Sequence, residues 1–446
     1  MLKKLFCGVA ATTLVLSSFF TRSFTLNAMG QNIGFDPKCS SLSLVSLDTG
    51  TTVYEKNANE RLPMASLTKI MTAIITIEHM EKLPERENTE IKVKNEILRS
   101  LEGTGSSMSG LKAGEDRTVL QLLHCLLITS GNDAALILAD FIGEGSVAKF
   151  VEMMNNKAKE LGCNDTNFAN PHGLDSDNHY TTARDLVIMQ KYATSLPFYT
   201  EITSTVTSKI LGDKKPILVT SNFMIDKNRG GKYYYKYAKS GKTGSDSKAG
   251  KCLVSVLNNG KYSYLCVALG GFSDNSSDNL AMLETKALGE WAFNNLEMKK
   301  IASKDAPLGE IKVNLSWNKK RLLLSTNKDY SVMLPKDVLV SSIDCKLDIP
   351  KFINAPVSKG QKIGTATFSY ANTVVATVDL LSGEDIKRSN ILFTMYLLKS
   401  IFTSFWFKLL FGILLILLVF YIMKFIKRNK YRKRRRRKAT FRRARF

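Results

Sequence analysis

The chain has 446 residues, of which 44% are hydrophobic and 23% charged, a composition typical of a globular protein with two or three domains. Its net charge of +23 is concentrated at the ends, because 18 Lys and Arg residues and no acid follow Asp385, and three more stand in the first 30 residues. Residues 31–385 therefore carry a net charge of only +2. This near-neutral body argues against nucleic-acid binding by the folded domains.

The first 28 residues have the layout of a secretory signal peptide. Two lysines precede an apolar stretch from Leu5 to Phe20, and a small residue, Ala28, suits a cleavage site. An uncleaved membrane anchor is the alternative interpretation of the same stretch.

Residues 29–300 are expected to form one domain in which helices lie between strands. The pattern predicts a hairpin over 41–55, a helix from Ser66 to Met80, two helices separated near Gly131, and a last helix over 280–296. Further helices are expected over 148–161 and 182–192, hairpin strands over 214–238, and strands over 252–257 and 262–269. This order indicates the α+β class.

Short alternating runs take over from about residue 302. They are predicted to be strands at 310–315, 321–325, 330–334, 338–345, 362–369 and 373–380. We expect an all-β domain over 301–390, built as a β-sandwich, that serves as a spacer or docking module.

An apolar stretch over 401–426 follows the β domain. Its uninterrupted core of 15 residues, Leu409–Met423, is shorter than the roughly 20 residues that a spanning helix needs, but flanking lysines can snorkel. We favour a transmembrane helix over an interfacial one. The basic tail over 427–446 would then stay in the cytoplasm, with anionic lipid rather than nucleic acid as its partner.

Six cysteines remain after the signal peptide, an even number that permits disulfides in an exported chain. Their spacing is irregular, so buried free thiols are equally compatible. The cysteines and the four histidines show no metal-ligand spacing. We expect neither a metal nor another cofactor.

Ser66 and Lys69 form the first candidate for catalysis. Residues three apart share a helix face, and a desolvated amine can take the proton of a neighbouring hydroxyl. The N-terminus of the helix would also favour a developing oxyanion. The signal is weak alone, because Ser-x-x-Lys recurs here at Ser109, Ser146, Ser245, Ser316 and Ser325.

Two further motifs supply groups that a serine acyl enzyme needs. Ser130-Gly131-Asn132 offers a hydroxyl and an amide on a turn, and Lys242-Thr243-Gly244 offers a cation and a hydroxyl beside a glycine. Taken singly, the first fits an ordinary turn between helices and the second a plain strand end.

In this order, the three motifs resemble those of the serine-active penicillin-binding enzymes. The stretches Arg61–Thr72, Leu126–Ala135 and Asn170–Leu186 are similar to the low-molecular-mass D-alanyl-D-alanine carboxypeptidases, and Ala355–Gly364 is similar to their C-terminal β domain. The resemblance covers roughly residues 38–390. It implies a β-lactamase/transpeptidase-like α+β catalytic domain.

The resemblance also implies roles for the motif residues. Ser66 would be the acylated nucleophile, Lys69 its general base, and Ser130 a relay of protons to the leaving amine. Asn132 would hold the substrate backbone. The other substrate-binding residues would be Lys242, Thr243, Gly244 and Ser245, with the backbone N–H groups of Ser66 and Ser245 as the oxyanion hole.

Two features near Lys242-Thr243-Gly244 bear on the assignment of the third motif. Lys239-Ser240-Gly241 also fits Lys-[Ser/Thr]-Gly, but Ala249-Gly250 stand at the family's distance from Gly244, which favours Lys242. The family often has Thr two places after that glycine, where this chain has Asp246. Asp246 would place a negative charge near an anionic substrate.

The function implied is removal of the terminal D-alanine from peptidoglycan stem pentapeptides, with β-lactams as inhibitors. A β-lactamase or a DD-endopeptidase on the same fold, or a non-catalytic wall-binding protein, are the alternatives. The chain has no clear counterpart of the deacylating Glu motif of class A β-lactamases. The intact motif residues speak against a scaffold role.

Overall fold

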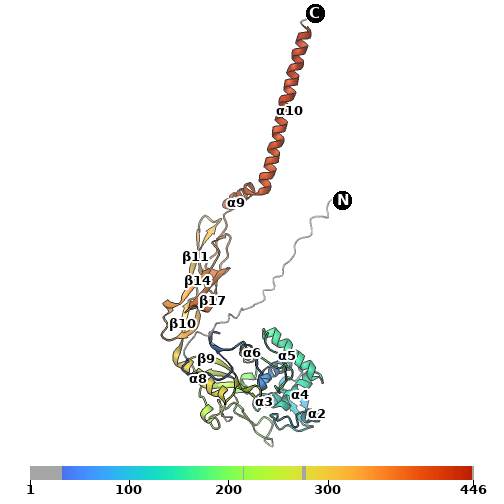
Figure 1. Cartoon of the computed structure of the whole chain (residues 1–446), viewed down its shortest axis with the longest axis vertical. Helices are drawn as coiled ribbons and strands as arrows, with labels where there is room; N and C mark the ends of the chain where they lie inside the picture. Colours follow the sequence, from blue (N-terminus) through green and yellow to red (C-terminus); the bar gives the residue numbers. More distant parts are fainter. Residues whose placement is uncertain (1–32, 214, 274–277, 444–446) are drawn as a thin grey trace. The chain divides into compact units, whose positions relative to one another are not determined.

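The structure is a computed structural model, and it describes residues 33–213, 215–273 and 278–443 (Figure 1). The expected signal peptide lies outside these residues. The chain divides into two compact units, of which the first holds the residues up to Lys299 together with Ser331–Ile343 and Ser369–Ala376. The second holds Lys300–Tyr330, Asp344–Phe368 and the residues from Thr377 onward. The domain limits expected from the sequence remain predictions.

A five-stranded antiparallel sheet forms the centre of the first unit, in the order β2-β1-β9-β8-β7. The strands are β1 (Ser41–Ser46), β2 (Thr52–Lys56), β7 (Ala238–Asp246), β8 (Gly250–Asn258) and β9 (Ser263–Gly271). The predicted hairpin over 41–55 and the predicted strands over 252–257 and 262–269 are thereby confirmed. Strand β7 lies at the edge of the sheet, so one of its edges is open to a ligand.

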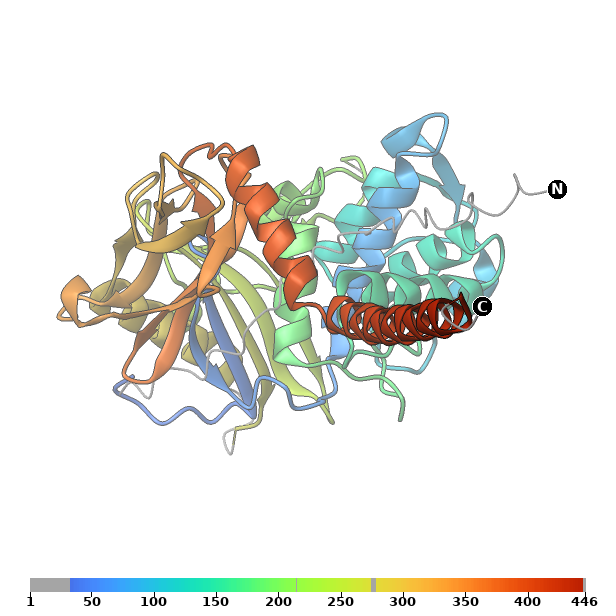
Figure 2. The ribbon, with the colours of Figure 1, turned by 90° about the horizontal axis from the view of Figure 1, so that it is seen from above.

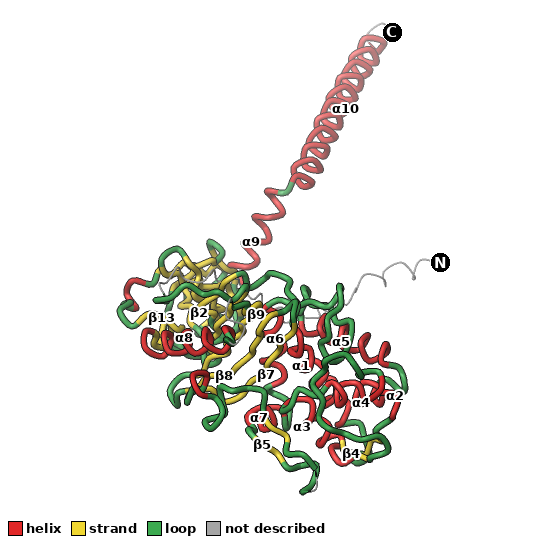
Figure 3. Tube along the Cα trace, turned by 60° about the horizontal axis from the view of Figure 1, so that its bottom comes forward, coloured by secondary structure: helices red, strands yellow, loops and turns green. Residues whose placement is uncertain are grey.

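Both faces of the sheet are buried, because the side chains of its strands alternate between two cores. In Figure 3, strands β7 and β8 lie between helices α8 and α1. On β9, Leu265 and Val267 belong to the core that contains α1 and α3–α6, whereas Tyr264 and Cys266 belong to the core that contains α8. A strand turns successive side chains to opposite faces, which explains this division. The sheet therefore separates the helical part that bears Ser66 from helix α8.

The helices of this unit follow the predicted periodicity closely. Their bounds are α1 (Lys69–Met80), α2 (Asn95–Arg99), α3 (Val119–Leu127), α4 (Asn132–Ile142), α5 (Val147–Leu161), α6 (Ala183–Ala193), α7 (Tyr199–Ser204) and α8 (Leu280–Asn295). A capping box, in which Thr118 and Gln121 bond reciprocally, fixes the start of α3. The short strands β3 (Glu90–Lys92) and β4 (Asp116–Thr118) pair with each other. The predicted break near Gly131 is confirmed between α3 and α4.

The predicted hairpin strands over 214–238 are wrong. Among the residues that the structure describes here, there is a two-residue pair, β5 (Thr207–Ser208) with β6 (Leu218–Val219), followed by turns and the 3-10 turn η3 (Gly231–Tyr233). The aromatic run has high β propensity, but side-chain oxygens of Asn222 and Asp226 accept backbone N–H groups that a ladder would need. The segment is therefore irregular.

The remaining strands form a six-stranded sheet, in the order β14-β16-β17-β12-β11-β15, and a pair of β10 with β13. The strands are β10 (Leu296–Ala302), β11 (Gly309–Asn314), β12 (Arg321–Ser325), β13 (Tyr330–Pro335), β14 (Asp344–Asp348), β15 (Phe352–Asn354), β16 (Lys362–Tyr370) and β17 (Thr373–Ser382). The all-β character is confirmed, and the sandwich arrangement stays a prediction. The strand predicted over 338–345 is wrong in its first half, where a 3-10 turn, η4 (Val340–Ser342), precedes β14.

Two helices end the chain, α9 (Asn390–Thr403) and α10 (Phe405–Arg443), and Figure 2 shows the chain changing direction between them. Residues Phe405–Lys433 of α10 are long and apolar enough to cross a membrane. The predicted span over 401–426 begins too early, because α9 ends at Thr403 and Ser404 separates the two helices.

All six cysteines in the described part of the chain are free thiols, and five of them are buried. This outcome agrees with the thiol alternative rather than with a disulfide framework. Within the same part, no cluster of three or more His, Cys, Asp or Glu side chains is arranged to hold a metal ion.

Glu284 of α8 ties the start of the described chain to the first unit. Its buried carboxylate accepts the backbone N–H of Lys38 at 2.5 Å and that of Cys39 at 3.0 Å. We expect Glu284→Ala to lower the free energy of unfolding by about 1–3 kcal/mol, because two N–H donors lose their acceptor. Denaturant unfolding measures the change. Glu290→Ala, at an exposed position of the same helix, is the control, and equal loss in both variants would contradict the account.

Candidate active site

Ser66 lies on a 3-10 turn, η1 (Ala65–Thr68), that leads directly into α1. The α-helix itself begins at Lys69, three residues after the predicted start at Ser66. Ser66 lies in the 3-10 turn that precedes the helix. Ala65 has a φ of +45°, an unfavourable conformation for a residue with a Cβ. Ser66 is half-buried, while its neighbours Ala65 and Leu67 are buried. The turn therefore presents one hydroxyl at an otherwise closed surface.

The amine of Lys69 is fully buried and has three oxygen neighbours. Its Nζ lies 2.8 Å from Ser66 Oγ, 2.7 Å from Asn132 Oδ1 and 2.6 Å from the carbonyl oxygen of His172. The last two atoms can only accept hydrogen bonds. A neutral amine satisfies both with its two N–H groups and keeps its lone pair for the hydroxyl of Ser66.

The protonation of Lys69 is controlled by its surroundings. Burial lowers the pKa of Lys69 well below its usual range, and the positive charge of Lys242 lowers it further. The buried carboxyl of Asp133 acts in the opposite direction on the same pKa. The net effect favours the neutral amine, which is the form that can accept a proton from Ser66.

Ser130 and Lys242 form a second hydroxyl–amine pair. Lys242 Nζ donates to Ser130 Oγ at 2.7 Å and to the carbonyl oxygen of Thr243 at 2.9 Å. Both side chains are buried, and burial lowers the pKa of Lys242 to about 7. Ser130 has a φ of +64°, so the turn between α3 and α4 holds this residue in a strained conformation. Lys242 thus remains partly charged near neutral pH, beside a hydroxyl.

Strand β7 lies directly against the Ser66 turn at Gly244. A Cβ on Gly244 would stand 2.8 Å from the carbonyl oxygen of Met64 and 3.3 Å from Leu67 Cγ. Only a glycine permits this approach without a shift of the backbone. The edge strand with Lys242, Thr243 and Ser245 is thereby placed beside the nucleophile.

The alternative motif at Lys239 does not reach this site. The side chain of Lys239 is exposed, and its Nζ donates to the carbonyl oxygen of Lys236 at 3.1 Å. Lys242, in contrast, is 1% exposed and contacts Ser130. The geometry therefore agrees with the choice of Lys242.

Most of the chain matches known protein families. Residues 31–273 match the family model described as D-alanyl-D-alanine carboxypeptidase, and residues 296–388 match that of the C-terminal domain of penicillin-binding protein 5. The chain belongs to the D-alanyl-D-alanine carboxypeptidase family. This family uses a serine acyl-enzyme, and the hydroxyl–amine pair of Ser66 and Lys69 fits that chemistry.

Relatives cover most of this chain. The D-alanyl-D-alanine carboxypeptidase DacF of Bacillus subtilis is 32% identical over 79% of the chain and 87% of its own length. DacC of Escherichia coli is 27% identical over 85% of the chain and 92% of its own length. The crystal structures of penicillin binding protein 5 from Haemophilus influenzae superpose with a TM-score of 0.66 and 26% identity, covering 79% of this chain and 99% of that one.

Several residues of the site in this carboxypeptidase-family chain were not predicted. Asn132 Nδ2 donates to Ser106 Oγ at 2.9 Å, Ser221 Oγ lies 2.6 Å from Thr243 Oγ1, and Ser109 N–H donates to Asp133 at 2.8 Å. Serines in loops carry no spacing signal. Only Asp133, which follows directly after a motif and is buried, offered a hint in the sequence.

His179 supports the Ser66 turn from outside the motifs. Ala169 N–H donates to His179 Nδ1 at 2.9 Å, so the neutral ring donates from Nε2 to Thr68 Oγ1 at 2.6 Å. Thr68 Oγ1 in turn donates to the carbonyl oxygen of Ala65 at 2.7 Å. Burial lowers the pKa of His179 to about 4 and that of His172 to about 3, so both rings stay neutral at pH 7. This series of hydrogen bonds holds Ala65, the strained residue next to Ser66.

Asp246 is turned toward its own hairpin. Its Oδ1 accepts the backbone N–H groups of Lys248 at 2.8 Å and Ala249 at 2.6 Å, so the carboxylate caps the turn between β7 and β8. Lys248 forms an ion pair with Asp175 at 2.7 Å. The negative charge of Asp246, which was expected near the substrate, is therefore hydrogen-bonded by backbone N–H groups of the turn.

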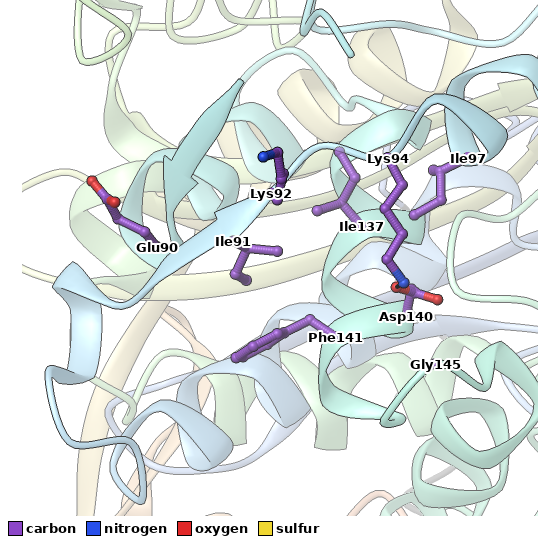
Figure 4. A pocket seen from close by; sticks show the side chains of 9 residues that line it. All are labelled: Glu90, Ile91, Lys92, Lys94, Ile97, Ile137, Asp140, Phe141 and Gly145. Atoms are coloured by element: carbon purple, nitrogen blue, oxygen red, sulfur yellow. Dashed lines mark hydrogen bonds and ion pairs between the residues drawn. The ribbon is translucent and has the colours of Figure 1, made fainter. Parts of the chain in front are cut away.

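A shallow pocket lies elsewhere, between β3, α2 and α4 (Figure 4). Its volume is about 260 Å³, and its walls include Ile91, Ile137, Phe141 and the ion pair of Lys94 with Asp140. Asp140 is eight residues beyond Asn132 on α4, about 12 Å along the helix axis. The pocket is therefore separate from the serine site.

Proposed function

We propose that this chain is a serine-type D-Ala-D-Ala carboxypeptidase that removes the terminal D-alanine from peptidoglycan stem pentapeptides. The observation that carries the proposal is the surrounding of Lys69. Its amine has two obligatory acceptors, on Asn132 and His172, and one hydroxyl, that of Ser66. This arrangement leaves the amine lone pair directed at the nucleophile. The names of the relatives agree with this activity.

The proposed acylation step uses both hydroxyl–amine pairs. Ser66 Oγ attacks the carbonyl carbon of the penultimate D-alanine while Lys69 takes the hydroxyl proton. The backbone N–H groups of Ser66 and Ser245 stabilise the oxyanion, which is supported by the close approach of Gly244 to the Ser66 turn. Ser130 passes a proton to the leaving amine. Free D-alanine departs, and water then hydrolyses the ester on Ser66.

Substrate binding is proposed for the edge strand and the α4 turn. The side chains of Lys242 and Thr243 bind the terminal carboxylate, because a buried cation and a hydroxyl suit a small anion. Asn132 holds the peptide backbone of the substrate. Gly244 keeps the strand close enough for this contact. β-Lactams bind the same groups and acylate Ser66.

The nucleophile assignment predicts labelling by a fluorescent penicillin. Full-length protein should carry one label on Ser66, and Ser66→Ala should carry none, because the amine beside Ser66 has two acceptors for its N–H groups and a strongly lowered pKa, whereas the amine beside Ser130 stays partly charged and donates to that hydroxyl. Mass spectrometry of the digested adduct locates the label. Ser316→Ala, which removes another Ser-x-x-Lys serine, should label like the parent protein. Label on Ser66→Ala would sink the assignment.

The two lysines predict a bell-shaped dependence of acylation on pH. Protonation of Lys69 removes the base, so the second-order rate constant falls as the pH drops through its lowered pKa. Lys242, with a pKa of about 7, loses its charge as the pH rises above 7, so the rate constant falls there too. Stopped-flow acylation by a penicillin from pH 4 to 10 measures both limbs, with a loss of about tenfold per pH unit beyond each.

A guanidinium stays charged throughout this range, which provides a test of the alkaline limb. Lys242→Arg should move this limb to higher pH, whatever its effect on the absolute rate. Lys239→Arg, on the same strand but exposed, should leave the profile unchanged. An alkaline limb that stays in place in Lys242→Arg would refute its origin in Lys242.

We also propose a single-pass topology. Residues 1–28 are a signal peptide, the catalytic domain spans 29–300 and the β domain 301–390, both outside the membrane. The support is the apolar helix Phe405–Lys433 and the basic residues that follow it. The tail over 427–446 then lies in the cytoplasm against anionic lipid.

External protease acting on protoplasts tests this topology. It should digest the catalytic domain but leave an epitope tag fused after Phe446 intact. The tag should be lost only after the membrane is permeabilised. A tag digested in intact protoplasts would overturn the proposed orientation.

A further inference from the structure

Residues 167–180, here called the histidine loop, pack directly against the Ser66 turn. A Cβ on Gly173 would stand 2.0 Å from the carbonyl oxygen of Ala65 and 2.9 Å from Thr68 Oγ1. Gly173 also has a φ of +93°, a conformation that residues with a Cβ rarely adopt. The backbone of the loop therefore touches the turn that carries the nucleophile, and only a glycine allows this approach.

Both ends of the histidine loop are anchored. The backbone N–H groups of Asn167 and Tyr180 each donate to the carbonyl oxygen of the other residue, at 2.9 and 3.1 Å. Beside this bridge, Asn155 of α5 binds both backbone groups of Phe168. Its Oδ1 accepts the N–H at 2.8 Å, and its Nδ2 donates to the carbonyl oxygen at 2.9 Å. The position of the loop is thus fixed by α5.

The histidine loop makes two polar contacts with the segment that carries the proposed nucleophile and base. The carbonyl oxygen of His172 accepts a hydrogen bond from Lys69 Nζ at 2.6 Å. Seven residues later, His179 Nε2 donates to Thr68 Oγ1 at 2.6 Å. Thr68 Oγ1 donates in turn to the carbonyl oxygen of Ala65 at 2.7 Å. One loop therefore holds the base directly, and it holds the residue before the nucleophile through Thr68.

Thr68 is completely buried, and both roles of its hydroxyl are used. The single hydrogen is donated to Ala65, and a lone pair accepts the ring N–H of His179. Without this hydroxyl, a buried donor and a buried acceptor would each lose a partner, which is costly inside a protein. Ala65 has a φ of +45°, a conformation that persists only while its surroundings hold it. Loss of the hydroxyl would therefore let the backbone at Ala65 relax.

We propose that the Thr68 hydroxyl is a positioning group for acylation, through which the histidine loop sets the distance between Ser66 Oγ and Lys69 Nζ. The inference deepens the proposed function and takes the roles of these two residues from it. Their atoms are 2.8 Å apart, within the reach of about 2.6–3.2 Å that proton transfer needs. Relaxation of Ala65 moves the adjacent hydroxyl, while the carbonyl oxygen of His172 keeps the amine in place. A misplacement of about 1 Å can slow such a step about 100-fold.

Two substitutions of Thr68 separate its hydroxyl from its shape. Thr68→Val keeps the size of the side chain and removes the hydroxyl, whereas Thr68→Ser keeps the hydroxyl and removes a methyl group. In full-length protein, the second-order rate constant for acylation by a fluorescent penicillin should fall about 10- to 100-fold in Thr68→Val. It should stay within about threefold of the parent value in Thr68→Ser. The kcat/KM for diacetyl-Lys-D-Ala-D-Ala should fall by the same factors.

The matched control is Thr76→Val on the same helix. Thr76 is equally buried, and its Oγ1 donates to the carbonyl oxygen of Thr72 at 2.7 Å, away from the Ser66 turn. This variant should be acylated like the parent. Urea unfolding shows that each variant is folded. If Thr68→Val does not fold, His179→Phe, which keeps a ring but removes its N–H donor, provides the same comparison with a loss of about tenfold.

Three outcomes would overturn the proposal. They are a folded Thr68→Val that is acylated like the parent, a Thr68→Ser as slow as Thr68→Val, and an equal loss in Thr76→Val. The second would assign the effect to packing, and the third to a general loss of stability in α1. A parent protein that is acylated by penicillin but does not hydrolyse the peptide would instead refute the proposed function, and the comparison of acylation rates would still test the role of Thr68.

Discussion

The site depends on the burial of two lysine amines at fixed positions. An ammonium ion in a dry interior loses hydration worth several kcal/mol even after relaxation, so burial favours loss of the proton unless carboxylates compensate. Here the acceptors around Lys69 are an amide, a carbonyl and a hydroxyl, all of them neutral. Among the described residues, the carboxyl of Asp133 raises the pKa of Lys69, but it is not one of the three hydrogen-bond partners of the amine. Neutral acceptors orient the base without fixing its charge, which is what a proton acceptor requires.

The positions of these amines rest on backbone conformations that cost free energy. Ala65 and Ser130 both occupy the left-handed region, each at a cost of about 1–3 kcal/mol. The surrounding packing offsets this cost. The chain of hydrogen bonds from His179 through Thr68 to Ala65 holds the first residue, and the contact of Lys242 with Ser130 holds the second. Strain is thus stored at the two hydroxyl-bearing turns, while the helices that carry them are regular.

The sequence predicts those parts of the molecule whose signal is local. Apolar periodicity predicts α5 and α6 to within one residue at each end, because each helix buries one face in the core. The catalytic motifs are harder to identify from local signals, since Ser66-x-x-Lys69 by itself is one of several equal Ser-x-x-Lys matches. The choice of Ser66 depends on the resemblance to a family, and local propensity alone does not supply it.

The parts that escaped prediction depend on contacts between distant residues. The carbonyl oxygen of His172 orients Lys69, and a backbone acceptor leaves no trace in composition. The tyrosine-rich run before β7 has a high β propensity, which predicts strands. Its backbone donors are taken by Asp226 and by residues of the same loop, an outcome that only the folded chain decides.

Charge distribution connects the chemistry to its surroundings. The body from 31 to 385 is almost neutral overall, so long-range attraction to an anionic wall is weak and must come from local concentrations of charge. One such concentration lies in the last part of α10, after its apolar stretch, and the other precedes β7. At physiological ionic strength the field of an exposed charge fades within about 8 Å, so a cluster acts only on ligands that touch it. The charges before β7 can therefore act only on what lies beside that segment, and those at the end of α10 only on what lies beside the tail.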